Sequence, residues 1–105
     1  MSEMTILTEY RTKPGKRDEL FDAIRQLLAH PKTAGQDAVV WSTSTTELNV
    51  SFLFQYWSEA EGFADLAITE WYADYAMVVD KLVTSPPVIT VTVPVLVEGL
   101  SSPRL

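Results

Sequence analysis

The sequence has 105 residues, enough for one domain and too few for two. Apolar residues make up 47% and charged residues 21%, which are globular proportions and exclude a disordered or collagen-like chain. The net charge of −6, without any basic cluster, argues against binding to nucleic acid or to an anionic membrane.

The absence of cysteine excludes disulfides and thiolate chemistry, and a single histidine, His30, excludes a multi-histidine metal centre within one chain. The N-terminus has no secretory signal, and no apolar stretch approaches the roughly 20 residues that span a bilayer. We therefore expect a cytoplasmic protein without a metal.

Residues Met4–Arg11 are predicted to form a strand, with Met4, Ile6, Thr8 and Tyr10 on one face. Lys13-Pro14-Gly15 ends this strand. A helix is predicted over residues 16–30, because its apolar positions recur at helical spacing: Leu20, Ala23, Ile24, Leu27 and Leu28.

The next two elements are predicted to be strands joined by a turn at residues 46–49. The first covers residues 37–45, which are rich in valine and threonine. The second is Val50–Trp57, the clearest strand in the chain. Its alternation places Val50, Phe52, Phe54 and Tyr56 on one face and Ser51, Leu53, Gln55 and Trp57 on the other.

Ser58 followed by Glu61 fits a capping box, so a second helical region is predicted to begin there. Gly62 weakens this region, Thr69 is a possible break, and the helical stripe resumes from Glu70. The Pro86-Pro87 pair ends it. Residues 88–97 alternate cleanly and are predicted to form a strand near a sheet edge, where Pro94 loses no hydrogen bond.

The order β-α-β-β-α-β predicts an α+β, ferredoxin-like fold: a four-stranded antiparallel sheet with two helices on one face, formed by residues 1–105 as a single domain. The core is expected over residues 4–97, with residues 98–105 as a tail or a dimer arm. The sheet face without helices would expose apolar side chains, so we expect a homodimer through the sheet faces.

Residues 4–97 also resemble the antibiotic biosynthesis monooxygenase superfamily, whose members are dimeric α/β barrels. The resemblance rests on the order and spacing of several motifs: Lys13-Pro14-Gly15-Lys16, Tyr56-Trp57-Ser58-Glu59-Ala60, Trp71-Tyr72-Ala73-Asp74-Tyr75, Leu82, Pro86-Pro87 and Pro94. It implies a pocket between sheet and helices where an aromatic, phenolic or quinol-type molecule reacts with O₂ without a cofactor. Such electron-rich substrates can reduce O₂ themselves, so the protein must deprotonate, orient and exclude water.

The aromatic concentration and the resemblance together nominate Trp57, Tyr72 and Tyr75 as catalytic residues. Trp57 matches the superfamily's tryptophan, but its polar partners four residues earlier and six residues later are replaced by Leu53 and Phe63. Haem degradation is not expected, because the second helical region has no histidine. The proposed substrate-binding set is Trp71, Phe63, Leu53, Phe54 and Glu9.

Two alternatives remain open. The first is a protein that binds an apolar metabolite without catalysis, since few acid–base groups accompany the rings. The second is an isomerase or cyclase-like enzyme that uses His30 or Glu9 as the base. A salt bridge to Arg11 or to a helix residue is the competing role for Glu9, and a helix C-terminal position is the competing role for His30.

Overall fold

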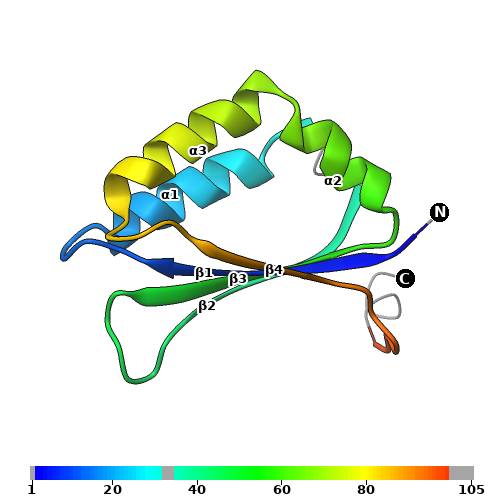
Figure 1. The fold of residues 1–105 in the computed structure, drawn as a ribbon, viewed down its shortest axis with the longest axis horizontal. Helices are drawn as coiled ribbons and strands as arrows, with labels where there is room; N and C mark the ends of the chain where they lie inside the picture. The colour runs from blue at the N-terminus through cyan, green and yellow to red at the C-terminus, as the bar shows by residue number, and fades with distance from the viewer. Residues whose placement is uncertain (1, 32–34, 100–105) are drawn as a thin grey trace.

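The computed structural model describes residues 2–31 and 35–99, which form a sheet covered on one face by helices (Figure 1). Within these residues the sheet has four antiparallel strands in the order β2-β3-β1-β4, so the predicted ferredoxin-like topology is confirmed. None of the described helices is long and apolar enough to cross a membrane. The elements in chain order are β1 Met4–Arg11, α1 Arg17–Leu28, β2 Gln36–Thr43, β3 Val50–Trp57, α2 Ala60–Ala67, α3 Glu70–Leu82 and β4 Val88–Thr92.

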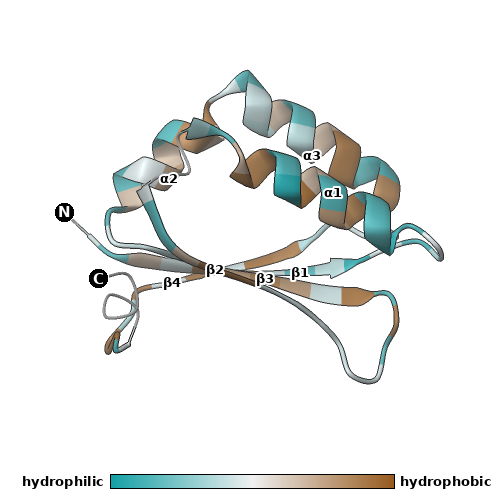
Figure 2. Ribbon diagram, turned by 180° about the vertical axis from the view of Figure 1, so that it is seen from behind, coloured by the Kyte–Doolittle hydropathy of each residue, from teal (hydrophilic) through white to brown (hydrophobic). Residues whose placement is uncertain are grey.

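The two faces of the sheet follow the predicted alternation. Thr8 lies opposite Leu53 and Ile6 opposite Gln55, and all four side chains are buried beneath the helices. Leu7 pairs with Phe54 on the other face, which carries no helix. Figure 2 shows hydrophilic and hydrophobic stretches alternating along the helices, as expected for helices that lie with one side on a sheet.

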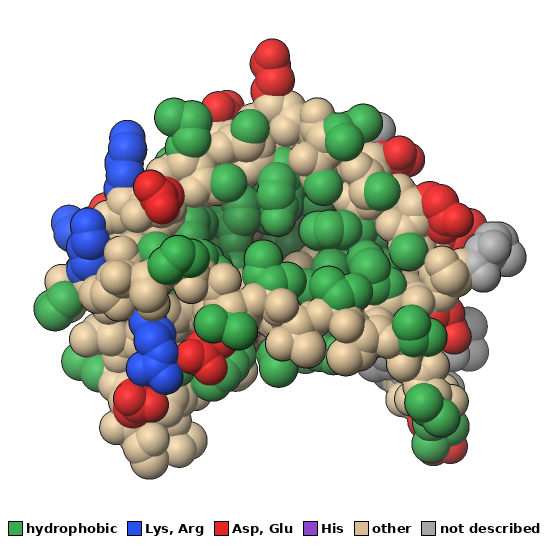
Figure 3. Space-filling model, viewed as in Figure 1, with side chains coloured by type: hydrophobic (Ala, Val, Ile, Leu, Met, Phe, Trp, Pro, Cys, Tyr) green, Lys and Arg blue, Asp and Glu red, His purple; other side chains and the backbone are tan. Residues whose placement is uncertain are grey.

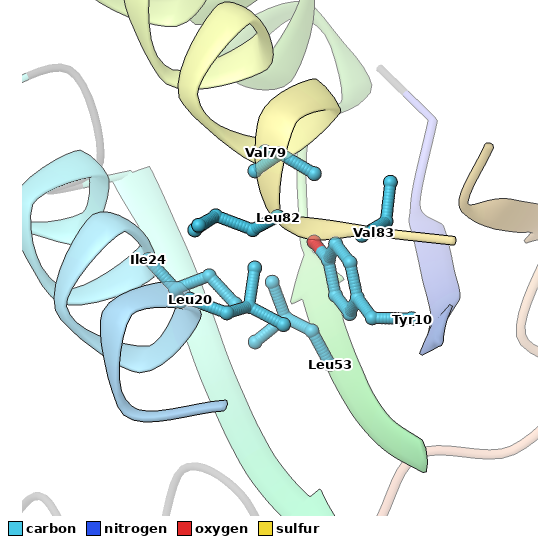
Figure 4. Close-up of a cluster of buried hydrophobic side chains, with 7 residues drawn as sticks. All are labelled: Tyr10, Leu20, Ile24, Leu53, Val79, Leu82 and Val83. Atoms are coloured by element: carbon cyan, nitrogen blue, oxygen red, sulfur yellow. The ribbon is translucent and has the colours of Figure 1, made fainter. Parts of the chain in front are cut away.

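Two clusters of buried side chains join the helices to the sheet. Figure 4 shows the first, in which the ring of Tyr10 stands between the sheet and α3 with its hydroxyl directed toward α3. The second surrounds Trp57, which is completely buried. The first cluster consists of Tyr10, Leu20, Ile24, Leu53, Val79, Leu82 and Val83. The second consists of Ile6, Leu27, Trp57 and Leu66.

The second helical region is divided at Thr69, as the sequence indicates. The Thr69 hydroxyl donates to the carbonyl oxygen of Leu66 at 2.7 Å and accepts from the Tyr72 N–H at 3.1 Å. One side chain therefore closes the end of α2 and caps the start of α3.

The predicted capping box at Ser58 is wrong. The helix begins at Ala60 after an extended Glu59, and no side chain caps it. The Ser58 N–H instead donates to the Asp37 carboxylate at 2.6 Å, a partner from β2 that local sequence spacing does not reveal. Gly62 follows in α2, where an added Cβ would lie only 3.1 Å from the indole carbon Cε3 of Trp57.

The last strand is shorter than predicted. β4 ends at Thr92 rather than at residue 97, because its only neighbour, β1, begins at Met4 and Thr5 already pairs with Thr92. Pro94 therefore lies beyond the strand, in a stretch whose apolar side chains Val93, Val95 and Leu96 are exposed. Residues 100–105 of the predicted tail lie outside the described residues.

Candidate functional site

A cavity of about 210 Å³ lies between the sheet and the helices. Figure 3 shows hydrophobic side chains lining the hollow beneath the helical layer. The sheet provides the floor, and α1, α2, α3 and the Pro86-Pro87 segment provide the walls. The lining residues are Ile6, Thr8, Tyr10, Leu27, Leu28, Leu53, Gln55, Phe63, Leu66, Tyr72, Tyr75, Ala76, Val79, Asp80, Pro86, Pro87 and Ile89.

Two phenol groups meet in this cavity. The hydroxyls of Tyr10, from β1, and Tyr75, from α3, are hydrogen-bonded to each other. Burial raises the pKa of Tyr10 from 10.0 to about 12, and burial together with Tyr10 raises the pKa of Tyr75. Both groups stay protonated at neutral pH, so one proton forms the bond between them and the other can be donated to a ligand.

An aromatic row forms the wall next to this pair. Tyr72 lies 5.6 Å from Tyr75 between ring centroids, and Phe63 meets Tyr72 edge-on at 6.0 Å. Burial raises the pKa of Tyr72 as well. Of the nominated residues, the structure thus brings Tyr72, Tyr75, Phe63 and Leu53 together around one cavity.

Trp57 does not line the cavity. Its ring is completely buried against Phe63, at 5.8 Å between centroids. Its indole N–H donates at 3.1 Å to Oε1 of Gln55, which does line the cavity. Trp57 therefore contacts the cavity only through its neighbours.

Trp71 and His30 lie outside the cavity. Trp71 lines an open groove between α1 and α3, where its indole N–H donates to the Gln26 carbonyl oxygen at 3.2 Å. The His30 ring packs against Trp71 at 5.3 Å. Tyr75 borders both the cavity and this groove, whereas Trp71 borders only the groove.

Phe54 and Glu9 lie on the opposite face of the sheet, which corrects the expectation that they line the pocket. Phe54 pairs with Leu7, and Glu9 pairs with Phe52. The reason is the two-residue period of a strand, which sends neighbours of Leu53 and Thr8 away from the helices. Glu9 forms a salt bridge with Arg11 at 3.0 Å, the competing role expected from the sequence.

Sequence reasoning missed four polar members of the lining: Thr8, Tyr10, Gln55 and Asp80. The signal was present for three of them, because Thr8 and Tyr10 share a strand face with Ile6, and Gln55 shares one with Leu53. A polar side chain on a core-facing strand position needs a partner or a cavity. Asp80 is exposed on α3, where it resembled a solvated residue.

The arrangement can bind a ring compound that carries oxygen. Its walls are aromatic and aliphatic, and its polar groups include hydroxyls and an amide that can donate hydrogen bonds. Within residues 2–31 and 35–99, no group of three or more His, Cys, Asp or Glu side chains is placed to hold a metal ion.

Comparison with known proteins supports the fold. No family model matches the sequence, and no curated protein matches it. Solved structures do match. A "putative antibiotic biosynthesis monooxygenase" from Chloroflexus aurantiacus is 18% identical, with a TM-score of 0.80 over 95% of this chain and 100% of that one. Rv0793 from Mycobacterium tuberculosis is 19% identical, with a TM-score of 0.81 over 93% and 100%.

A third structure, from Caulobacter crescentus, carries the same monooxygenase name and is 16% identical, with a TM-score of 0.80 over 90% of this chain and 92% of that one. At these identities the likeness concerns the backbone. The sequence resemblance predicted the same superfamily from its motifs. The chain therefore has the fold of structures named as antibiotic biosynthesis monooxygenases.

Proposed function

We propose that this chain is a cofactor-independent monooxygenase-like enzyme that oxidises a small aromatic, phenolic or quinol-type molecule with O₂. The observation that carries the proposal is the hydrogen-bonded Tyr10–Tyr75 pair inside a cavity whose walls are mostly apolar. The cavity, at about 210 Å³, is smaller than the roughly 300–1,000 Å³ of common ligand pockets. A substrate of one or two rings fits this size better than a polycyclic one.

The proposed reaction needs no redox group from the protein. The substrate loses a proton from a ring CH₂ or its phenol tautomer, and the resulting anion passes one electron to O₂. The radical pair combines to a peroxide on carbon, and loss of water leaves a carbonyl, so CH₂ and O₂ become C=O and H₂O. One hydroxyl of the Tyr10–Tyr75 pair would donate a hydrogen bond to the oxygen on which negative charge develops, while the other donates to its partner in the pair.

Asp80, exposed at the rim of the cavity, is the proposed acceptor for the substrate proton, directly or through water. His30 and Glu9 do not line the cavity, so the isomerase alternative lacks a base from either of them. The binding-protein alternative keeps one supporting observation: among the described lining residues no histidine and no buried carboxylate is present.

We also propose that two copies of the chain pair through the sheet face that carries no helix. Leu7, Val40 and Val88 on that face are 44%, 54% and 60% exposed. A two-fold axis would place the same apolar strip on both partners, and aligned sheets pack well face to face.

Oxygen uptake by metal-stripped protein, with hydroquinones and naphthols as substrates, tests the proposed reaction. We expect uptake above the spontaneous rate, unaffected by a chelator, and lowered at least about tenfold in Tyr75→Phe, because this change breaks the hydroxyl pair that donates to the developing charge.

Tyr56→Phe is the matched control, since it removes a hydroxyl that bonds Glu3 on the other side of the sheet. It should keep the parent rate. Tyr75→Phe with the parent rate would contradict the role of the phenol pair. Saturable binding of the same compounds without oxygen uptake would favour the binding protein.

A further inference from the structure

Gln55 is a buried amide whose two ends have different surroundings. Its side chain is 8% exposed, on the helix-facing side of β3, and it lines the cavity. Its oxygen Oε1 accepts two hydrogen bonds, from Trp57 Nε1 at 3.1 Å and from Gln36 Nε2 at 2.8 Å. Its amide N–H groups have no hydrogen-bond partner among the described residues.

Trp57 determines the orientation of the Gln55 amide group. An indole N–H can only donate, so it requires the oxygen of Gln55 and rejects the nitrogen. Turning the amide by 180° would set N–H against N–H in a site that water does not reach. Gln36, from β2, adds a second donor to the same oxygen. The two donors therefore keep the Gln55 N–H groups on the other side of the amide.

Among the described residues, Ser51 Oγ is the only completely enclosed side-chain polar atom without a partner, so the unpaired Gln55 nitrogen is not sealed off by protein. Here the amide borders a cavity with room for a ligand. A ligand atom that accepts a hydrogen bond would supply the missing partner.

We propose that the Gln55 amide donates a hydrogen bond to a carbonyl or phenolate oxygen of the ligand, and that Trp57 and Gln36 are positioning residues that hold this amide in its donating orientation. The proposal rests on the cavity of the proposed function and narrows its ligand to ring compounds with an oxygen acceptor. It also gives buried Trp57 a role that needs no contact with the substrate.

Three two-ring probes of similar size can be compared by calorimetry. 1-Indanone accepts a hydrogen bond, indole donates one, and indane does neither. We expect the parent protein to bind 1-indanone about tenfold more tightly than indane. Indole should gain nothing from Gln55, because the Gln55 amide presents only its donors to the cavity, so Gln55→Met should leave the affinity for indole unchanged.

Gln55→Met keeps the length of the side chain and removes the amide. It should lower the preference for 1-indanone several-fold, to what the Tyr10–Tyr75 pair alone can provide, and leave the affinity for indane unchanged. Gln26→Met, the same change on the exposed face of α1, is the control and should keep the tenfold preference.

Trp57→Phe keeps a large buried ring and removes one of the two donors, so the donating orientation of the amide is held less strongly. The preference should fall by about threefold while indane still binds, since Gln36 continues to hold the oxygen. If Trp57 had a purely structural role, Trp57→Phe would lower the affinities for 1-indanone and indane by the same factor. In the parent protein, 1-indanone should shift the Gln55 side-chain amide signal in a ¹⁵N–¹H spectrum and indane should not, a readout that depends on no variant.

Equal affinities for 1-indanone and indane, with an unmoved Gln55 signal, would overturn this proposal and leave the cavity as a ligand site. If the protein selects 1-indanone but takes up no oxygen with any substrate, the hydrogen bond from Gln55 is supported and the proposed reaction is overturned.

Discussion

Tyr10 and Tyr75 share a hydrogen bond in a place where neither phenol ionises easily. The bond lowers the pKa of Tyr10 and raises that of Tyr75, as expected when Tyr75 donates to the Tyr10 oxygen. Burial is the larger influence on both, so each pKa lies above its usual value. The cavity is therefore uncharged around these groups at neutral pH and favours a neutral ring over an ion.

The raised pKa of Tyr10 predicts a loss of stability in alkali. The unfolded chain releases this proton near pH 10.0, whereas the folded chain holds it to about 12. Between these values the unfolded state binds fewer protons, so the free energy of unfolding falls as the pH rises, and Tyr10 contributes no loss below that range. Urea unfolding followed across this range should show a shallower decline in Tyr10→Phe, because one of the raised pKa values is removed. An identical decline in parent and variant would contradict this account.

Residue types were easier to predict than the direction in which they point. Tyr72, Tyr75, Phe63 and Leu53 were chosen for their chemistry and position, and they do lie around the cavity. Trp71 is next to Tyr72 in sequence, but the helical rotation of about 100° per residue turns it to the outer groove. No local sequence pattern shows whether an aromatic ring at a core-facing strand position, such as that of Trp57, lines a cavity or is enclosed by other side chains.

The break between α2 and α3 changes the direction of the helical layer above the sheet (Figure 1). Phe63 and Leu66 line the cavity from α2, and Tyr72 and Tyr75 line it from α3. Thr69 determines where the direction changes, because its hydroxyl bonds both helix ends.

Thr69→Ala removes both of these hydrogen bonds. The loss of the N-cap is expected to lower the free energy of unfolding by about 1 kcal/mol, which corresponds to a Tm lower by roughly 4–8 °C in a domain of this size. Thermal unfolding measured by circular dichroism checks the value. Thr69→Ser retains the hydroxyl and should keep most of the stability, so equal losses in the two variants would disprove the capping role.

The strands show where local prediction succeeds and where it stops. Val50–Trp57 was predicted at its observed bounds, because it is a central strand whose two neighbours support the whole alternation. The alternation after Val88 continues to Val97, but beyond the Thr5–Thr92 pair β1 has only Met4 left. Propensity and period describe a single segment, whereas the length of an edge strand depends on its neighbour.

The molecule as a whole is a two-layer structure with one apolar face left without helices (Figure 1). Phe52 and Phe54 lie half-buried in the middle of this face, next to exposed Leu7 and Val40. A contiguous apolar surface of this kind commonly marks an association surface. The proposed pairing of two copies would remove it from water.

Leu7→Lys tests the pairing by placing a charge in the middle of the proposed interface. Sedimentation equilibrium should give about twice the 11.8 kDa chain mass for the parent and the single mass for Leu7→Lys. Met77→Lys, a similar change at an exposed position of α3, should remain paired. A parent protein that sediments as a single chain would refute the dimer.

The contact between Gly62 and Trp57 determines how closely α2 packs on the sheet. With no side chain at position 62, the helix rests directly on the indole, and a Cβ there would meet ring carbons Cε3 and Cζ3 at 3.1 and 3.2 Å. The buried ring has little freedom to retreat, so a methyl group would lift α2 by some tenths of an ångström and carry Phe63 and Leu66 with it. The width of the cavity is thus set at a position that never touches the ligand, and altering that one residue would retune the range of accepted ring sizes.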